Sequence, residues 1–256
     1  MLDISEESQG IRVIKLARPP VNALNSELTR ALIEAVGAAQ GDAAMVITGQ
    51  PGLFSGGLDV PALLMLDRAA ISVMFTDLWR LQRAIATSAV PVIFGITGHC
   101  PAGGTVLAIH GDYRVMAQGD YRLGLNEVQV GLFPGPVIYA AFQRLVGGHA
   151  AQLTTRGALI DPATALRVGL VDELCEAAQV PARALEVARE FAALPRESML
   201  RTRALARRDL VELFGTPGHA SDSEREFAAT GTDIWFMPAT QDRLRMMFKK
   251  KPVPPT

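Results

Sequence analysis

The segment VPVIFGITGHCPAGGTVLAIHGDYRVMA, residues 90–117, decides the fold of this chain. It begins with an uninterrupted apolar run at residues 90–97, which predicts a buried strand. A glycine-rich turn at 98–104 leads into a short apolar helix at 105–110, and a second strand follows at 113–117. This succession of strand, helix and strand predicts an α/β core.

A long stretch that overlaps the first part of this segment carries no formal charge. Residues 84–111 contain no Asp, Glu, Lys or Arg, and a stretch of this length is sufficient to cross a bilayer. Prolines and glycines interrupt it, however, and it contains His99 and His110, a pattern typical of strand, turn and helix inside a protein core. We therefore expect no transmembrane segment and no membrane partner.

The composition indicates a globular protein with a substantial core. The chain has 256 residues, of which 49% are hydrophobic and 20% charged, and these values argue against intrinsic disorder. Its 25 Lys and Arg residues balance 26 Asp and Glu residues, so no electrostatic footprint for a nucleic acid is expected. The two cysteines, Cys100 and Cys175, are too few for a disulfide framework and indicate reduced thiols in a cytosolic protein.

Outside the central segment, strands and helices alternate first and helices dominate later. We predict strands at residues 11–16 and 45–48. The predicted helices begin at Asn25 or Ser26, span 72–87 and 138–146, follow the Asp161-Pro162 cap up to Gly169, span 181–194 and 197–213, and begin at a capping box at 221–224. This order predicts a core domain over residues 1–195 and a C-terminal helical region over residues 196–256, with a frayed tail from residue 249.

The first of three segments that could carry chemistry is FSGGLD, residues 54–59. Its two glycines follow a strand and would let the backbone bring its N–H groups close to a ligand. Taken alone, the segment is more often an ordinary turn between a strand and a helix.

The second segment is HCPAGGT, residues 99–105, between the apolar strand and the apolar helix. Its glycines would let an anion or a developing oxyanion approach the free N–H groups at the helix start, although a tight turn needs the same small residues. It is not a phosphate-binding loop, because no Lys follows the glycines. A nucleophilic role for Cys100 is the less favoured interpretation. His99, its neighbour in sequence, points in a different direction, so the two residues make a poor pair of nucleophile and base.

The third segment is GLNEVQVG, residues 124–131. Glu127 is the only charged residue between Arg122 and Arg144, and a carboxylate in apolar surroundings has the raised pKa that suits a general base. A solvent-facing glutamate in a loop fits the pattern equally well. No G-x-S-x-G motif occurs and the four histidines lack metal-ligand spacing, so we expect neither a serine hydrolase nor a metal site.

In this order and spacing, the segments resemble the crotonase superfamily, also called the enoyl-CoA hydratase/isomerase family, over nearly the whole chain. The matching stretches are RPPVNALN (18–25), FSGGLD (54–59), CPAGG (100–104), DYRVMA (112–117), GLNE (124–127) and ALRVGLV (165–171). The resemblance implies an α/β crotonase-type spiral of ββα units, whose C-terminal helices mediate oligomerisation into a homotrimer or a hexamer. It also implies an acyl-CoA thioester substrate, with coenzyme A as part of the substrate and no separate cofactor.

By this resemblance, the N–H groups of Leu58 and Gly103 form an oxyanion hole that stabilises a thioester enolate. The family's hydratases hold a water molecule with two glutamates; Glu127 matches the second, but Val106 stands at the position of the first. Valine can neither orient water nor transfer a proton. In CPAGG (100–104), DYR (112–114) and LNE (125–127), the chain most resembles the mitochondrial-type Δ3,Δ2-enoyl-CoA isomerases of the family. In that group the glutamate matching Glu127 is the single catalytic base.

Further residues receive candidate roles from the resemblance. The candidate dry walls of the acyl site are Val106, Phe133, Pro134 and Ile138, and the candidate CoA contacts are Arg18, Ala23 and Gly56. Lys249 and Lys250 could reach a neighbouring subunit's phosphates, although a solvated tail is the commoner outcome. The first predicted strand begins at residue 11, which leaves no room for a mitochondrial targeting segment, so we expect a bacterial-type cytoplasm.

Three alternatives stay open. A hydratase or an acyl-CoA hydrolase could share the fold and the glycine turns. A noncatalytic acyl-CoA-binding protein could also keep the fold, because a fold does not guarantee an activity.

Overall fold

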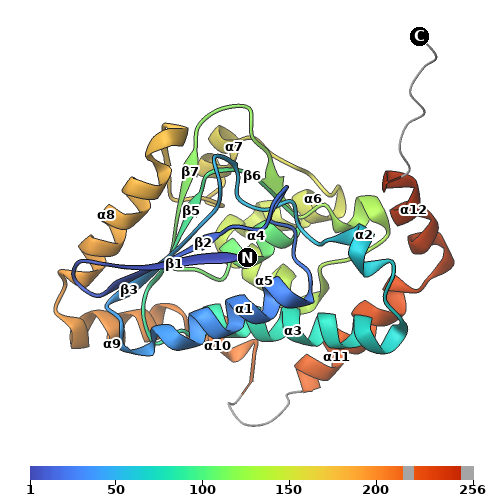
Figure 1. Ribbon diagram of the computed structural model, residues 1–256, viewed down its shortest axis with the longest axis horizontal. Coiled ribbons are helices and arrows are strands. Elements are labelled where there is room, and N and C mark those ends of the chain that lie inside the picture. The colour runs from blue at the N-terminus through green and yellow to red at the C-terminus, as the bar shows by residue number, and fades with distance from the viewer. Residues whose placement is uncertain (216–221, 249–256) are drawn as a thin grey trace.

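The computed structural model describes residues 1–215 and 222–248 as an α/β structure (Figure 1). The strands are β1 (Leu2–Glu7), β2 (Ile11–Leu16), β3 (Ala44–Thr48), β4 (Gly52–Leu53), β5 (Val92–Ile96), β6 (Gly98–Pro101), β7 (Tyr113–Ala117), β8 (Leu123–Gly124) and β9 (Glu173–Cys175). The α-helices are α1 (Ser26–Gly37), α2 (Val60–Leu63), α3 (Arg68–Ala86), α4 (Gly103–Ala108), α5 (Gly135–Val146), α6 (Ala150–Thr155), α7 (Pro162–Arg167), α8 (Val180–Ala192), α9 (Arg196–Ala206), α10 (Arg208–Glu212), α11 (Asp222–Trp235) and α12 (Pro238–Phe248). Short 3₁₀ helices are η1 (Ala38–Gly41), η2 (Glu127–Val130), η3 (Gly147–His149) and η4 (Ala177–Gln179).

The chain winds as a spiral that repeats the unit strand, strand, helix. The larger sheet has the order β1-β2-β3-β5-β7-β9, with only β1 antiparallel to its neighbour in the described chain, and the smaller sheet has the parallel order β4-β6-β8. Each turn adds one strand to each sheet before a helix: β3, β4 and α2–α3, then β5, β6 and α4, then β7, β8 and α5. The predicted spiral of ββα units is therefore confirmed. Because β4, β6 and β8 are parallel, the segments that follow them lie at the same edge of the smaller sheet.

Alternate residues of the larger sheet face two separate hydrophobic clusters. Ile47 and Phe94 belong to the cluster that includes α1 and α3, whereas Val46 and Ile93 belong to the cluster that includes α8. Figure 1 shows α8 on the opposite side of this sheet from α1 and α3. The alternation follows from the two-residue period of a strand. Burial on both faces explains why residues 90–97 are continuously apolar.

Side-chain caps start two of the predicted helices where they were expected. The Asn25 side chain accepts a hydrogen bond from the Leu28 N–H at the start of α1, and the Asp161 side chain accepts one from the Thr164 N–H at the start of α7. Helix α3 begins earlier than the predicted residue 72, because Asp67 caps it and accepts a hydrogen bond from Ala70.

The predicted single helix at 197–213 is wrong, because the helix breaks at Arg207 into α9 and α10. The Arg207 guanidinium is buried and donates to the Asp112 carboxylate at 2.8 Å. It also donates to the backbone oxygens of Ala86 at 3.0 Å and His110 at 2.7 Å. These partners lie at the end of α3 and in the turn that follows α4, so helical periodicity alone does not show the break.

The glycine-rich turn predicted at 98–104 also needs a correction. Its first part forms strand β6, because the Cys100 N–H donates to the Arg122 backbone oxygen and pairs β6 with β8. A strand of four residues that contains a glycine and a proline carries too little periodicity to be predicted.

Helix α11 packs along α3 and closes one side of the interior. A Cβ atom on Gly231 would lie 2.9 Å from the Phe75 ring, so a larger residue does not fit at this crossing. The Phe75 ring meets Phe227 and Trp235 edge-on, with centroids 6.2 and 6.3 Å apart.

The domain boundary after residue 195 stays a prediction, and one hydrophobic cluster includes residues from both sides of it.

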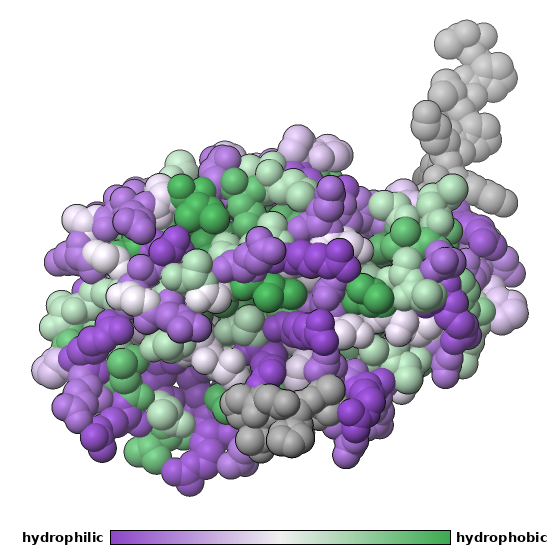
Figure 2. Space-filling model, turned by 60° about the horizontal axis from the view of Figure 1, so that its bottom comes forward, coloured by the Kyte–Doolittle hydropathy of each residue, from purple (hydrophilic) through white to green (hydrophobic). Residues whose placement is uncertain are grey.

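Two sequence predictions concern residues outside the described chain. They are Ser221, the first residue of the predicted capping box, and the tail from residue 249, with Lys249 and Lys250. Within the described ranges, no helix is both long enough and apolar enough to cross a membrane. Figure 2 shows hydrophilic and hydrophobic residues mixed on one face of the molecule.

Arg207→Ala should lower the free energy of unfolding by about 1.5–3 kcal/mol, because the buried Ala86 and His110 oxygens lose a charged donor, while Arg203 still pairs with Asp112. Urea denaturation measures this loss. The matched control is Arg201→Ala on α9, which removes an exposed ion pair with Glu197 and should cost about 0.5 kcal/mol or less. Equal losses in the two variants would contradict the role assigned to the buried contacts.

Candidate active site

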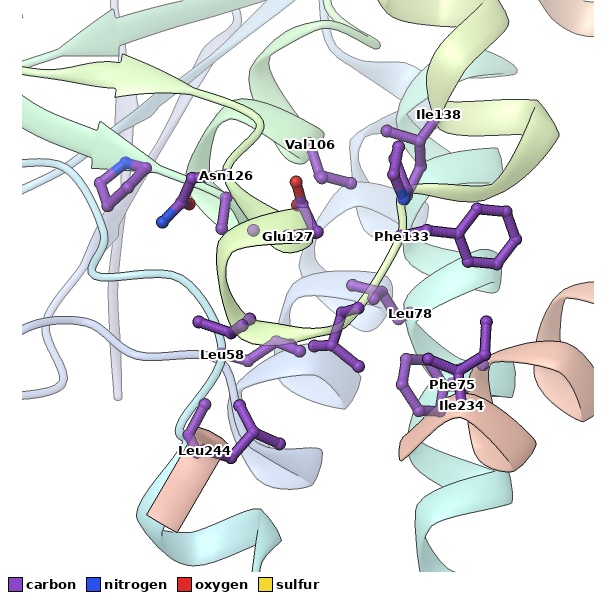
Figure 3. A pocket seen from close by; sticks show the side chains of 18 of the residues that line it. Leu58, Phe75, Leu78, Val106, Asn126, Glu127, Phe133, Ile138, Ile234 and Leu244 are labelled. Carbon is purple, nitrogen blue, oxygen red and sulfur yellow. The ribbon is translucent and has the colours of Figure 1, made fainter. Parts of the chain in front are cut away.

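A cavity of about 280 Å³ lies where the chain leaves β4, β6 and β8. Eight of the ten predicted site residues line it: Gly56, Leu58, Gly103, Val106, Glu127, Phe133, Pro134 and Ile138. Helices α3, α11 and α12 complete the wall with Phe75, Leu78, Phe227, Ile234, Leu244 and Met247 (Figure 3). The fold therefore brings the three candidate segments of the sequence to one cavity.

Two glycine turns meet at this cavity. Gly57 has a φ of 86°, in the left-handed region that disfavours residues with a side chain. A Cβ atom on Gly57 would lie 3.5 Å from the Gly103 nitrogen. A Cβ atom on Gly103 would lie 3.3 Å from the Gly57 Cα and 2.9 Å from the Leu24 side chain. The two backbones therefore touch, and neither turn has room for a larger residue.

The turns present two backbone N–H groups without partners. Within residues 1–215 and 222–248, neither the Leu58 N–H nor the Gly103 N–H donates a hydrogen bond. Leu58 itself is held on both sides, because Leu24 N–H donates to Gly57 O at 2.7 Å and Asp59 N–H donates to Leu24 O at 2.9 Å. An unpaired N–H beside an apolar cavity costs free energy unless a ligand oxygen accepts from it. Two neighbouring donors of this kind suit an oxyanion.

Ala102 joins β6 to α4 in a strained conformation, with φ 45° and ψ −115°. Strain of this kind costs about 1–3 kcal/mol and persists only where surrounding contacts hold it. Here the Ala102 N–H donates to Gly124 O at 2.8 Å, and the Ala102 oxygen accepts from Val106 N–H at 2.8 Å. These bonds fix the direction in which the Gly103 peptide follows β6.

The Thr105 hydroxyl ties the second glycine turn to the segment that carries Glu127. Its Oγ1 donates to the Cys100 backbone oxygen and accepts from the Gly124 N–H at 2.9 Å. Gly124 ends β8, three residues before Glu127. One buried side chain thus couples the position of the N–H donors to the position of the carboxylate.

Glu127 is the only titratable side chain that lines the cavity in the described chain. Its Oε2 atom is buried and has no hydrogen-bond partner among the described residues, and Figure 3 shows the carboxyl group directed toward Val106. Burial raises the pKa of this carboxyl group from 4.5 to about 7. Near neutral pH the group therefore exists in both protonation states, as proton transfer in two directions requires.

Sequence reasoning missed several residues of this site. Asn126 lines the cavity, and its Oδ1 atom is buried without a partner in the described ranges. Its only signal in the sequence was its place beside Glu127. The apolar residues of α3, α11 and α12 were missed as site residues too, because helical spacing predicts a buried face but not the cavity that the face meets.

Arg18 and Ala23 do not line the cavity, although both support its edge. The Arg18 guanidinium donates to the Asp59 carboxylate at 2.6 Å and to the Ala23 oxygen at 3.0 Å. Asp59 directly follows Leu58, so the ion pair holds the first glycine turn in place. Contact of Arg18 and Ala23 with coenzyme A stays a prediction.

The other candidate nucleophiles and ligands of the sequence are not part of the cavity wall. Cys100 is fully buried, and burial raises the pKa of its thiol, which keeps it protonated. Burial also lowers the pKa of His110 to about 4, so its ring is neutral. In the described part of the chain, no group of three His, Cys, Asp or Glu side chains is arranged to hold a metal ion.

Comparison with known proteins gives a consistent match. The sequence model of one family, described as enoyl-CoA hydratase/isomerase, matches residues 6–211. The chain is 30% identical over 205 residues to mitochondrial enoyl-CoA delta isomerase 1 of Homo sapiens, covering 78% of this chain and 68% of that protein. It is 30% identical over 199 residues to the probable enoyl-CoA hydratase echA17 of Mycobacterium avium, covering 76% and 77% of the two proteins.

Comparison with solved structures finds proteins of the same kind. It matches a crystal structure of human mitochondrial delta3-delta2-enoyl-CoA isomerase with a TM-score of 0.88 at 26% identity, covering 96% of each chain. An apo structure of an enoyl-CoA isomerase of Mycobacterium tuberculosis matches with a TM-score of 0.79 at 28% identity, covering 89% of this chain and 97% of that chain. The expected crotonase fold is thereby confirmed. The names of the relatives include both isomerases and hydratases, so they indicate a family rather than one reaction.

Glu127→Gln should stabilise the protein above pH 7. Because the folded state binds the proton more tightly than the unfolded state, Glu127 makes wild-type stability fall as the pH rises from 4.5 to about 7, and this loss is complete above that range. Gln resembles the protonated form at every pH. Urea denaturation should therefore show an advantage of the variant that grows from pH 5 to pH 8, and a difference that is independent of pH would contradict the raised pKa.

Proposed function

The chain belongs to the enoyl-CoA hydratase/isomerase family, and within this family we propose that it is a Δ3,Δ2-enoyl-CoA isomerase. One observation carries the proposal: Glu127 is the one titratable side chain on the cavity wall of the described chain, while Val106 stands where the family's hydratases have their other glutamate. A single carboxyl group with a pKa near neutrality suits the transfer of a proton between two carbon atoms. Similarity to the human isomerase in sequence and structure supports this choice.

The proposed reaction begins with the thioester oxygen bound to the N–H groups of Leu58 and Gly103. The Glu127 carboxylate removes a proton from C2 of the 3-enoyl thioester, and the C–H electron pair moves into the thioester to form a dienolate. The two N–H donors stabilise its oxygen. The protonated Glu127 then delivers the proton to C4, the double bond comes to lie between C2 and C3, and the carboxylate is restored.

Apolar walls would keep the proton on this path. Val106 and Ile138 are 2% and 4% exposed and line the cavity beside Glu127. Exclusion of water prevents hydration of the enoyl product and keeps the carboxylate basic. The same exclusion explains why the carboxyl group has a raised pKa before any substrate binds.

The alternative functions fit this geometry less well. A hydratase needs a second group that holds the attacking water, and Asn126 is the only other polar side chain on the cavity wall of the described residues. A hydrolase needs water at the thioester carbon, which the apolar walls disfavour. A protein that only binds acyl-CoA has no need for a buried carboxylate with a perturbed pKa next to unpaired N–H groups.

The proposal includes the other expectations of the sequence. Coenzyme A takes part only as a portion of the acyl-CoA substrate, without a separate cofactor or a metal ion. Assembly into a trimer or a dimer of trimers and a location in the cytoplasm stay predictions.

Conversion of 3-hexenoyl-CoA to 2-hexenoyl-CoA should be the main reaction, with hydration of crotonyl-CoA much slower. Glu127→Gln should lower turnover by about 10²–10⁴-fold, because it removes the only proton-transfer group, while acyl-CoA binding is kept. Chromatography of the products with both substrates measures this. Hydration without isomerisation, or a Glu127→Gln variant with wild-type rates, would contradict the assignment.

The rate should depend on pH through Glu127. Because the carboxylate is the active form, kcat/KM should rise as the pH increases and level off above the pKa of about 7. A pH profile measured with 3-hexenoyl-CoA between pH 5 and 9 tests this expectation. A profile that is already level at pH 5 would exclude a base with a raised pKa.

Gly57→Ala should lower kcat by about 10²–10³-fold, comparable to the loss of one oxyanion donor, because the new methyl group strains a φ of 86° and presses on Ala102 at 3.3 Å. The matched control is Gly37→Ala at the end of α1, where no atom lies within 4 Å of the added Cβ. This control should leave kcat unchanged. Equal activity of the two variants would show that contact between the turns is not required.

A further inference from the structure

A second cavity lies behind one wall of the candidate active site. Its volume is about 130 Å³, and it shares Phe75, Phe133, Pro134, Phe227 and Gly231 with the main cavity. The three aromatic side chains of this shared wall, Phe75, Phe133 and Phe227, are here called the aromatic partition. Aromatic side chains therefore make up most of the wall between the two cavities, and Pro134 and Gly231 complete it.

The partition lies beyond Glu127 as seen from the N–H donors. Figure 3 shows Leu58 and Asn126 on one side of Glu127 and Phe133 and Phe75 on the other. A thioester oxygen at the Leu58 N–H and reacting carbons at Glu127 would therefore direct the remaining acyl carbons toward the partition. This direction follows from the proposed function, on which the inference rests.

The volume of the main cavity limits the acyl group that fits before the partition. An apolar cavity of about 150 Å³ holds one benzene molecule, with its six carbons. The main cavity, at about 280 Å³, is nearly twice as large and would hold about a dozen carbon atoms. The second cavity would add about half as much again if the partition opened.

The members of the partition differ in how firmly they are held. Phe75 is fixed, because its ring lies against Gly231, where an added Cβ would approach within 2.9 Å. Phe227 packs edge-on against Phe75, with centroids 6.2 Å apart, and Phe133 is 45% exposed. Removal of the Phe227 ring would therefore join the two cavities while Phe75 stays in place.

The second cavity is less suited to hydrocarbon than the first. Ser223, Glu226 and Thr230 line it, whereas the main cavity has only Asn126 and Glu127 as polar side chains in the described chain. A methyl end that passed the partition would approach a carboxylate and two hydroxyl groups. In the wild-type protein the aromatic partition keeps acyl chains away from this cavity, and its apolar part, with Pro136 and Val137, opens to a chain only when the Phe227 ring is removed.

We propose that the aromatic partition sets the acyl chain length, so that the preferred substrates are medium-chain 3-enoyl-CoA thioesters of about 8 to 12 carbons. Phe227 is then a specificity-determining residue of the site. Up to this length, each added methylene group leaves water for an apolar wall. Longer chains meet the partition and gain nothing further.

The test is a chain-length series of 3-enoyl-CoA thioesters from 6 to 16 carbons, with kcat/KM measured for each. The wild-type value should rise about fourfold per methylene up to about 10–12 carbons, the increment expected for burial of one methylene group. It should be at least tenfold lower at 16 carbons. A wild-type optimum at 6 or at 16 carbons would overturn the proposal.

Two variants locate the cause of this limit. Phe227→Ala should move the optimum to 14–16 carbons and raise kcat/KM for the longest substrates at least tenfold. Phe236→Ala is the matched control, because Phe236 is also partly buried next to α11 but lines neither cavity. It should keep the wild-type length profile. An unchanged optimum in Phe227→Ala, with Met247→Ala shifting it instead, would show that the acyl chain leaves past α12 and would overturn the proposal.

Dissociation constants of saturated acyl-CoA thioesters distinguish a failure of the length limit from a failure of the proposed isomerase function. The same dependence on length should appear in binding, measured by calorimetry, for the wild type and both variants. If this dependence is seen but no 3-enoyl thioester is isomerised, the proposed function is wrong and the length limit stands. If isomerisation is seen but binding and rate do not depend on length, the proposed function stands and the length limit is wrong.

Discussion

Contact between the backbones of Gly57 and Gly103 is the constraint on which the rest of the site depends. The two turns follow β4 and β6, which pair in the smaller sheet, and each excludes a side chain from the other. The Leu58 and Gly103 N–H groups therefore stand at one cavity without partners in the described chain. Their unsatisfied hydrogen-bonding capacity is kept for a ligand, at a cost in stability that the surrounding core has to offset.

The carboxylate of Glu127 is also held at the cavity at a cost in stability. The Thr105 hydroxyl joins the second glycine turn to β8, which places Glu127 at a cavity with apolar walls. Burial raises the pKa of this carboxyl group to about 7, and this shift lowers the free energy of unfolding at neutral pH. Strain at Ala102, unpaired N–H groups and a buried carboxylate thus gather in one place, as is usual where structure serves a reaction rather than stability.

In the proposed reaction, proton chemistry and substrate size are decided by different residues of the cavity wall. Val106 in place of a second acid–base group would favour proton transfer between carbons over hydration. The aromatic partition, which would limit substrate length, is built from α3, α11 and the loop before α5. A family fold can therefore keep its two glycine turns while changes in a few wall residues alter both the reaction and the substrate length.

The sequence by itself determined the features that depend on a few neighbouring residues. The caps at Asn25 and Asp161 and the buried strand in residues 90–97 were predicted, because hydrogen bonds and periodicity of this kind are local. The spiral of ββα units was predicted from the resemblance of motifs such as CPAGG (100–104) and GLNE (124–127) to a known family. Only the tertiary structure decided the raised pKa of Glu127, the helix break at Arg207 and the partition behind Phe227. Each of these arises from side chains far apart in the chain, whose burial and contacts exist only once the sheets and helices have packed.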